Sequence, residues 1–305
     1  MKFITNKILI ASSEFDPGAD LETPDDKAFA STPLREPGIK IDNGVTKPWG
    51  HTFQNGDRGI SKTDAVSHTF EPLAYQLGKR LHVSVPRTVL RMLPHGITSL
   101  PALHSVQEKV HGKPFKELHN DMKRKAIDHS DYRKMAMFDW LTGNDDRHDG
   151  NFMYDHNRNQ VHAIDNGFAG NYRTIMPEYS TTKDGHVINA HMSGHTGHNL
   201  YDTGEHPIPE DFRKAITNTN PEEHAAIWAR YLNHPTFDKM VAQRRIPPIS
   251  QPQWYHGVNN ESVRQDLSKQ YLARLSTLKH HFANPQINTM RDLYYSLYPA
   301  AVRRT

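Results

Sequence analysis

The chain has no cysteine among its 305 residues. This absence excludes disulfide bonds, thiolate nucleophiles, cysteine-based zinc ribbons and S-palmitoylation. It also favours a reducing compartment. We therefore expect a cytoplasmic protein, with a delivered effector or a virion component as the alternatives.

Long hydrophobic runs are also missing. No run of about eighteen apolar residues occurs, so no membrane span is expected. The opening stretch MKFITNKILIASS is interrupted by Asn6 and Lys7, so we expect no export signal. No block of lysine and arginine is long enough to form a nucleic-acid-binding arm, and the formal net charge is only +3. We therefore expect no specific nucleic-acid partner.

The composition is that of a soluble globular protein on the polar side, with 36% hydrophobic and 23% charged residues. The length allows either one large domain or two lobes. Residues 11–38 are rich in proline, aspartate, serine and glycine and show no apolar periodicity. We therefore expect residues 1–38 to form an extended lead-in that adds little to a core.

The next segment, residues 39–112, shows strand and helix signals. GIKIDNGVTK has two short alternating runs around an Asn-Gly pair, which predicts a β-hairpin that ends near Lys47. Apolar residues then recur with helical spacing from Phe70 to Leu81, which predicts a helix. HVSVPRTVLRML and HSVQEKVHG are typical of strands, the second ending at Gly112.

The remainder, residues 113–305, indicates mainly helix. Residues 113–142 carry an apolar stripe, and helical patterns return after residue 206. No repeat of fixed period is present in the sequence. The predicted class is α+β, with a small sheet-containing lobe over residues 39–112 and a mainly helical lobe over residues 113–305.

The stretch GNDDRHDGNF concentrates charge in one short loop. Two short apolar runs follow, residues 152–155 and 161–164, and they predict an antiparallel hairpin. A hairpin that is symmetric about Arg158 places Asn151 opposite Asp165. An amide oxygen and a carboxylate at one point suit Mg²⁺, which proteins usually hold with one or two carboxylates and substrate phosphates.

Asp146 lies in the same loop, where its carboxylate is placed to accept a proton from an attacking hydroxyl. Asp139, further upstream, is predicted to be a structural hydrogen-bond acceptor. Calcium is a poor alternative, because Arg147 occupies the third position of an EF-hand count and His156 the twelfth, where a glutamate is required. A solvated polar turn is the other alternative, and the second carboxylate at Asp165 argues against it.

The motifs DDRHDGNF and AIDNGFAG resemble the catalytic and metal-binding motifs of the phosphatidylinositol 3-/4-kinase-like superfamily. They are closest to type II phosphatidylinositol 4-kinases and their bacterial and phage-type relatives. The resemblance implies a two-lobed kinase-like fold with ATP between the lobes. It implies Asp146 as the catalytic base and Asn151 and Asp165 as Mg²⁺ ligands. Arg147 and His148 belong to the same motif, either as catalytic residues or as braces of the loop.

The resemblance extends upstream to about residue 39. TKPWGH is similar to the strand that carries the ATP lysine, which implies that Lys47 holds the phosphates, with Lys62 as a competing candidate. FEPLAYQLGK resembles the following helix and implies Glu71 as the partner of Lys47. SVQEKVHG resembles the hinge that contacts adenine, which implies cofactor-binding roles for Gln107, Glu108, Lys109 and Val110.

The predicted activity is ATP- and Mg²⁺-dependent transfer of the γ-phosphate to a hydroxyl group. Type II lipid kinases use a cysteine-rich palmitoylated segment, which this chain lacks, so a protein acceptor is preferred to a phosphoinositide headgroup. One alternative is nucleotidyl transfer on the same fold. Another is a pseudokinase or a scaffold in a virion or effector, which the lack of a compact glycine-rich phosphate loop favours. The histidines of residues 186–206 indicate a solvated loop or, as a weaker alternative, a zinc site.

Overall fold

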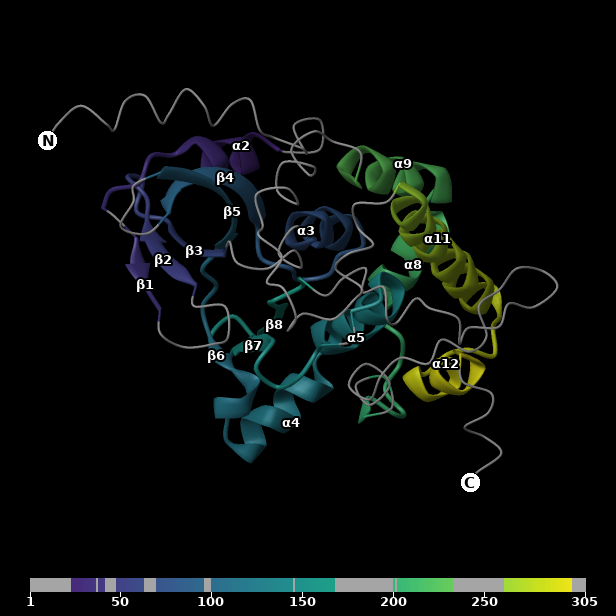
Figure 1. Ribbon diagram of the computed structural model, residues 1–305. Coiled ribbons are helices and arrows are strands. Elements are labelled where there is room, and N and C mark those ends of the chain that lie inside the picture. The colour runs from purple at the N-terminus through teal and green to yellow at the C-terminus, as the bar shows by residue number, and fades with distance from the viewer. Residues whose placement is uncertain are drawn as a thin grey trace, which may run out of the picture.

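The computed structural model describes residues 23–36, 38–41, 48–62, 70–95, 100–144, 146–167, 200, 202–232 and 261–297. Figure 1 shows a sheet-containing part formed by the first third of the chain and a mainly helical part formed by the rest. This arrangement confirms the predicted α+β class. Within the described ranges, no helix combines the length and the apolar character needed to cross a membrane.

The first sheet is antiparallel, with five strands in the order β1-β2-β3-β5-β4. The second arm of the predicted hairpin begins at Trp49, beyond Lys47, and residues 42–47 lie outside the described residues. The last predicted strand ends at Glu108, before Gly112. The strands are β1 (Ile39–Lys40), β2 (Trp49–Thr52), β3 (Arg58–Lys62), β4 (Thr88–His95) and β5 (Leu100–Glu108).

Helix α2 (Pro24–Ser31) corrects the expectation of an extended lead-in for this part of residues 1–38, whereas residues 1–22 lie outside the described residues. Thr23 and Asp26 form a capping box, in which each side chain accepts the backbone N–H of the other residue, at 3.3 and 3.0 Å. A cap and one buried aromatic ring thus fix a helix that has too few apolar residues to show periodicity. That ring is Phe29, which is 1% exposed and packs against Phe53, Val89, Leu93 and Val106.

Helix α3 (Glu71–Arg80) confirms the helix predicted in this segment. Residues 71–78 are all buried, and the apolar ones join the main hydrophobic core. On β5, Val106 packs on the α2 side, whereas its neighbour Ser105 contacts α3. Because successive side chains of a strand point to opposite faces, α2 and α3 cover opposite faces of the first sheet (Figure 1).

The second part holds a three-stranded antiparallel sheet, in the order β6-β7-β8, and most of the described helices. Its elements are β6 (Lys113–Pro114), the 3-10 helix η3 (Phe115–Glu117), α4 (Asn120–Asp128), α5 (Ser130–Thr142), β7 (Phe152–Asp155), β8 (Gln160–Ala163), α8 (Glu210–Asn218), α9 (Pro221–Leu232), α11 (Glu261–Ala283) and α12 (Met290–Leu297).

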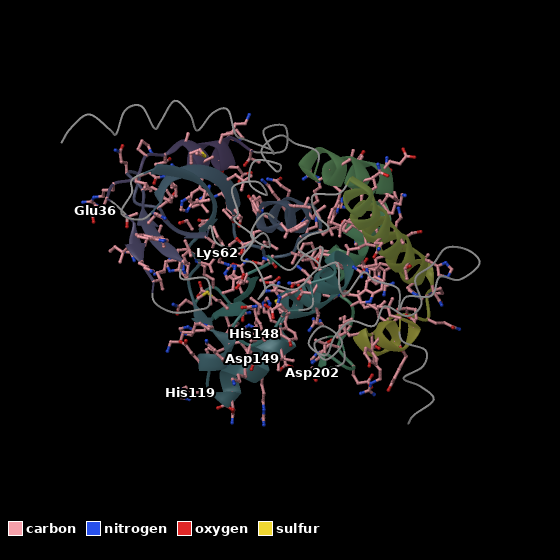
Figure 2. The ribbon with its side chains drawn as sticks, in the orientation of Figure 1. Glu36, Lys62, His119, His148, Asp149 and Asp202 are labelled. Carbon is pink, nitrogen blue, oxygen red and sulfur yellow. The ribbon has the colours of Figure 1, made fainter. Side chains whose placement is uncertain are left out.

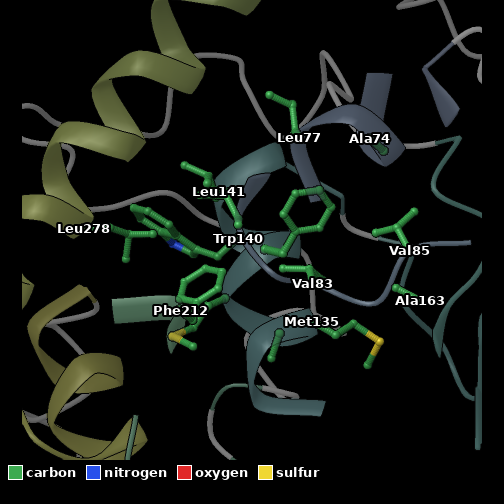
Figure 3. Packing of buried hydrophobic residues seen from close by; sticks show 14 of the residues in the cluster. Ala74, Leu77, Val83, Val85, Met135, Trp140, Leu141, Ala163, Phe212 and Leu278 are labelled. Carbon is green, nitrogen blue, oxygen red and sulfur yellow. The ribbon is translucent and has the colours of Figure 1, made fainter. Parts of the chain in front are cut away.

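Helix α5 is the centre of the main core, since residues 132–142 are all buried. Figure 3 shows Trp140 of this helix among side chains from three other helices: Phe212 of α8, Leu278 of α11 and Leu77 of α3. The helix ends at Gly143, whose φ of 71° is a left-handed conformation that glycine adopts without strain. This end directs the chain from the core into the charged loop.

The hairpin of β7 and β8 has a register one residue away from the prediction. Phe152 pairs with Ala163, so the four-residue turn is centred beside Arg158 and not on it. A turn with an even number of residues cannot be symmetric about a single residue. Asn151 therefore lies opposite Ile164, whose N–H donates to the Asn151 carbonyl at 3.1 Å.

Candidate active site

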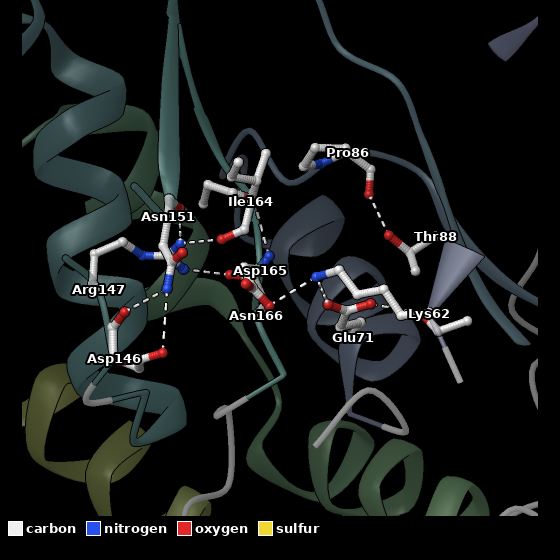
Figure 4. Close-up of polar contacts among 12 residues, drawn as sticks. Lys62, Glu71, Pro86, Thr88, Asp146, Arg147, Asn151, Ile164, Asp165 and Asn166 are labelled. Carbon is white, nitrogen blue, oxygen red and sulfur yellow. Dashed lines mark hydrogen bonds and ion pairs between the residues drawn. The ribbon is translucent and has the colours of Figure 1, made fainter. Parts of the chain in front are cut away.

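Three elements meet at a buried lysine (Figure 4). Lys62 ends β3, Glu71 begins α3 and Asp165 follows β8. Lys62 Nζ lies 2.7 Å from Glu71 Oε1 and 2.8 Å from Asp165 Oδ1. The side chains of Lys62 and Glu71 are 9% and 1% exposed, whereas that of Asp165 is 37% exposed. The lysine therefore links the first sheet, α3 and the hairpin, and its more accessible partner is Asp165.

Strand register explains why Lys62 reaches Glu71. Lys62 pairs with Ser105 across β3 and β5, so both side chains lie on the face of the sheet that α3 covers. The Ser105 hydroxyl donates to Glu71 Oε2 at 2.7 Å. Each oxygen of the Glu71 carboxylate thus has its own partner, which holds the group toward the sheet.

Lys62 carries its charge in this site. Burial alone disfavours the ammonium, but the carboxylates of Glu71 and Asp165 more than offset this effect and raise the pKa of Lys62 above its usual value. A fixed positive charge of this kind is what phosphate binding by a lysine requires.

The structure changes the predicted partner of Glu71. The prediction was Lys47, with Lys62 as the competing candidate, and the lysine found on Glu71 is Lys62. Lys47 itself lies outside the described residues. Spacing along the chain gave no sign of which lysine reaches Glu71, because the contact depends on the pairing of β3 with β5.

Asp165 reaches Lys62 through an uncommon backbone conformation. Its φ is +55°, in the left-handed region, which aspartate tolerates better than most residues. Asp165 comes after the last paired residue of β8, Ala163, so the strand ladder no longer dictates the direction of its side chain. The residue therefore turns its carboxylate toward the lysine.

Arg147 is the structural centre of the charged loop. Its side chain is 0% exposed and makes paired bonds to Asp139 on α5, from Nε to Oδ2 at 2.9 Å and from Nη2 to Oδ1 at 3.0 Å. The same guanidinium donates to the carbonyls of Asn151 and Ile164 and to the side chain of Asn166. These bonds tie α5, the loop and the end of the hairpin together, so Arg147 positions the site from within the core.

Asp139 is the structural hydrogen-bond acceptor that its sequence position predicted. Asn144 Nδ2 also donates to it, at 2.9 Å. Burial raises the pKa of Asp139, and the bonds from Arg147 and Asn144 oppose this rise.

Asn144, Asn166 and Ser105 were not predicted as parts of the site. Asn144 belongs to the charged stretch GNDDRHDGNF and Asn166 to the motif AIDNGFAG, which is a usable signal, whereas nothing local marks Ser105.

Asp146 and Asn151 are held together in the loop. Asn151 Nδ2 donates to the Asp146 carbonyl at 2.7 Å and to Asp146 Oδ2 at 3.3 Å. Asn151 is buried and Asp146 is half-buried. The bonds fix the Asp146 carboxylate and use the amide nitrogen of Asn151, so its amide oxygen is the atom that can ligate a cation.

His148 lies on the exposed side of the loop. Its ring Nδ1 accepts the N–H of Gly150 at 3.0 Å, and its own backbone N–H donates to the Asp146 carbonyl at 2.9 Å. Both contacts are with the loop backbone. They favour the interpretation of His148 as a brace of the loop.

Asn151 and Asp165 offer the donors for a divalent cation. They lie at the same end of the hairpin, because the Ile164 N–H bonds to the Asn151 carbonyl and Asp165 comes next. Figure 4 shows both side chains between Asp146 and Lys62 in the view. Among the residues that the structure describes, no group of three or more histidine, aspartate or glutamate side chains could hold a metal by itself. One carboxylate and one amide oxygen, completed by substrate phosphates, nevertheless suit Mg²⁺.

The predicted hinge, residues 107–110, closes the end of β5. Gln107 is paired with strands on both sides. The N–H groups of Glu108 and Lys109 donate to carbonyls of neighbouring segments, at 2.7 and 2.8 Å. The N–H groups of Glu108 and Lys109 are therefore engaged within the fold.

Comparison with known proteins gives similar solved structures, two of which are a kinase and a phosphotransferase. No protein-family model and no curated protein matches the chain. The proinflammatory kinase CtkA of Helicobacter pylori is 12% identical over 83% of this chain and 96% of that chain, with a TM-score of 0.41. An aminoglycoside phosphotransferase from Alicyclobacillus acidocaldarius is 14% identical over 81% of this chain and 93% of that chain, with a TM-score of 0.27. At such identities and TM-scores, neither likeness assigns an activity or a substrate to this chain.

Proposed function

We propose that this chain is an ATP- and Mg²⁺-dependent phosphotransferase of the protein-kinase-like class, which transfers the γ-phosphate to a hydroxyl group. The observation that carries the proposal is the buried bridge from Lys62 to Glu71 and Asp165, at 2.7 and 2.8 Å. Phosphoryl transfer requires a cation on the phosphates, a metal and a carboxylate that orients the nucleophile. The site offers a residue for each of these tasks.

Lys62 takes the role of the phosphate-binding cation, and Glu71 positions it. Asn151 and Asp165 would hold Mg²⁺, which neutralises charge that develops on the transferred phosphoryl group. The role predicted for Lys47 passes to Lys62 because the latter carries the contact with Glu71. The adenine would lie against residues 107–110, between the sheet-containing and helical parts.

Asp146 takes the role of the base. Its carboxylate accepts the proton of the acceptor hydroxyl while that oxygen forms a bond to the γ-phosphorus. The bond from the γ-phosphorus to the β–γ bridging oxygen breaks, and ADP leaves. Asn151 Nδ2, 3.3 Å from Asp146 Oδ2, fixes the carboxylate, and the buried Arg147 holds the loop that carries both.

A protein hydroxyl is the acceptor that we propose, with a phosphoinositide headgroup as the second candidate. The motifs DDRHDGNF and AIDNGFAG support membership of the phosphatidylinositol 3-/4-kinase-like superfamily. We also propose a division into lobes at about residue 112, with α2 added to the first lobe because Phe29 packs against the first sheet.

The test is incubation with γ-labelled ATP, Mg²⁺ and protein or phosphoinositide acceptors, followed by intact-mass measurement. Transfer of a phosphate-sized increment supports the proposal. A nucleotide-sized increment would assign nucleotidyl transfer, and a chain that neither transfers phosphate nor hydrolyses ATP would be a pseudokinase or scaffold. Lys62→Met should abolish transfer. Lys125→Met, at an exposed lysine of α4, is the matched control and should leave transfer unchanged.

A further inference from the structure

A concave surface lies beside the turn of the β7-β8 hairpin, at the opposite end of the hairpin from Asn151. This surface, the α4 cavity, has a volume of about 630 Å³ and lies between β6, the β7-β8 turn and the start of α4. None of the residues assigned above to catalysis or cofactor binding lines it. Figure 2 shows His119 on the outer side of α4, away from Lys62. The lining of the α4 cavity includes Lys113, Leu118, His119, Met122, Tyr154 and Arg158.

The floor of the α4 cavity is apolar. Leu118 and Met122 are half-buried and pack against the main core, so part of each side chain remains accessible. Tyr154 is buried, and its hydroxyl donates to Asn159 Oδ1 at 2.8 Å. Since that hydroxyl already has a partner, the floor offers a ligand apolar contact and no unmet polar group.

The rim of the α4 cavity is basic. Lys113, His119 and Arg158 are exposed on it. Two carboxylates also line the cavity. That of Asp155 is buried, accepts two backbone N–H groups of the turn at 3.0 and 3.2 Å, and lies 3.9 Å from Nε of the exposed Arg158, which leaves Glu117 as the accessible acid. At the N-terminus of α4 the His119 side chain makes no capping bond, so the first N–H groups of the helix add partial positive charge.

The segment that contributes Lys113, Leu118, His119 and Met122 to this cavity is rich in positive charge. Residues 109–125 contain six lysines or arginines and two acidic residues, a net charge of +4, whereas the complete chain carries +3. Lys116, Arg124 and Lys125 of this segment are exposed. The surface therefore attracts anionic partners before contact is made.

We propose that the α4 cavity is a docking site for an acidic protein segment that carries an apolar side chain. The acidic residues would face Lys113 and Arg158, and the apolar side chain would enter over Leu118 and Met122. A free phosphate would use the rim and leave the apolar floor uncovered. A flat anionic membrane would contact exposed basic residues outside the cavity but would not fill a concave surface.

The α4 cavity is near enough to the candidate active site to position a protein acceptor. Strand β7 runs from the residue after Asn151 to Asp155, which lines the cavity, and four strand residues span about 13 Å. A docked segment could therefore reach the charged loop with a few extended residues. The docking itself is a matter of binding and does not depend on the proposed function.

The test is fluorescence anisotropy of the full chain with a labelled peptide in which aspartates and glutamates flank a single leucine. We expect binding that weakens as salt is raised. The double variant Lys113→Glu and Arg158→Glu should bind about tenfold more weakly, because two attractive rim contacts become repulsive. The control is Lys27→Glu with Lys40→Glu, which changes the net charge equally at two exposed lysines of the first sheet-containing part, outside the cavity lining, and should alter affinity by no more than about twofold.

A charge-neutral variant tests the apolar floor separately. Met122→Ser should weaken binding of the leucine peptide but not of a peptide with glycine in place of the leucine. Equal losses of peptide affinity in the two double variants would overturn the proposal. Equal binding of the leucine and glycine peptides to the wild-type chain would also overturn it. So would binding to phosphatidylserine vesicles with no binding to the acidic peptide, since that result assigns the face to a membrane.

Discussion

Replacing Glu71 with glutamine tests the bridge that defines the site. The change keeps the shape of the side chain and removes its charge, while the Ser105 hydroxyl can still donate to the amide oxygen. Removing one partner of a buried ion pair usually destabilises a protein by about 3–5 kcal/mol. Lys62 keeps Asp165 at 2.8 Å, so we expect the lower end, a loss of about 3 kcal/mol in the free energy of unfolding.

The assay is denaturant unfolding of wild-type and variant chains, with thermal unfolding as a second readout. The matched control is Glu36→Gln, whose carboxylate lies 4.0 Å from Arg35 with both side chains 67% exposed. Such a surface pair should contribute less than about 0.5 kcal/mol. If Glu71→Gln unfolds at the same denaturant concentration as the wild type, the buried Lys62–Glu71 contact does not form in solution.

Four further changes have distinct expected outcomes. Asp146→Asn should lower turnover by about 10²–10⁴-fold in the labelled-ATP assay and leave ATP-dependent stabilisation intact. Arg147→Ala should lower the free energy of unfolding in urea by about 3–5 kcal/mol, because it removes the ion-pair partner of the buried Asp139 carboxylate. Phe29→Ala should lower the free energy of unfolding by about 3 kcal/mol in the same assay, since this ring packs α2 against the first sheet. Burial, with Arg91 adding to it, lowers the pKa of His51 from 6.5 to about 4. Between these two pH values His51 is protonated in the unfolded chain but neutral in the folded one. The free energy of unfolding should therefore fall by about 3 kcal/mol as pH drops from 6.5 to 4, and His51→Gln should reduce this loss.

Local signals in the sequence predicted the elements that rest on local interactions. The helix at α3 follows from apolar spacing. The first hairpin was predicted to end near Lys47, but residues 42–47 lie outside the described residues and its second strand begins at Trp49. The capping box of Thr23 and Asp26 was a local signal for α2, yet this helix was not predicted. Only one of its apolar side chains, Phe29, is fully buried, so the sequence shows no apolar periodicity there. The α+β class therefore followed from the sequence, and this short helix did not.

Contacts between distant segments were harder to predict. The choice between Lys47 and Lys62 depends on β3 pairing with β5, where Lys62 faces Ser105, and no spacing along the chain encodes that pairing. The one-residue error in the hairpin register came from placing the centre of the turn on Arg158. Asp165 still joins the site because its left-handed backbone, with φ of +55°, redirects the side chain after the strand has ended.

The most direct test of the site is the Mg²⁺ dependence of stabilisation by ATP. With ATP at about 100 times its Kd, the wild-type chain should gain about 2.7 kcal/mol of stability when Mg²⁺ is present. Asp165→Ala should remove the Mg²⁺-dependent part of this gain, whereas Asp149→Ala, at an exposed carboxylate of the same loop, should retain it. A wild-type chain that ATP does not stabilise, or an Asp165→Ala variant with the full Mg²⁺-dependent gain, would contradict the proposed nucleotide site.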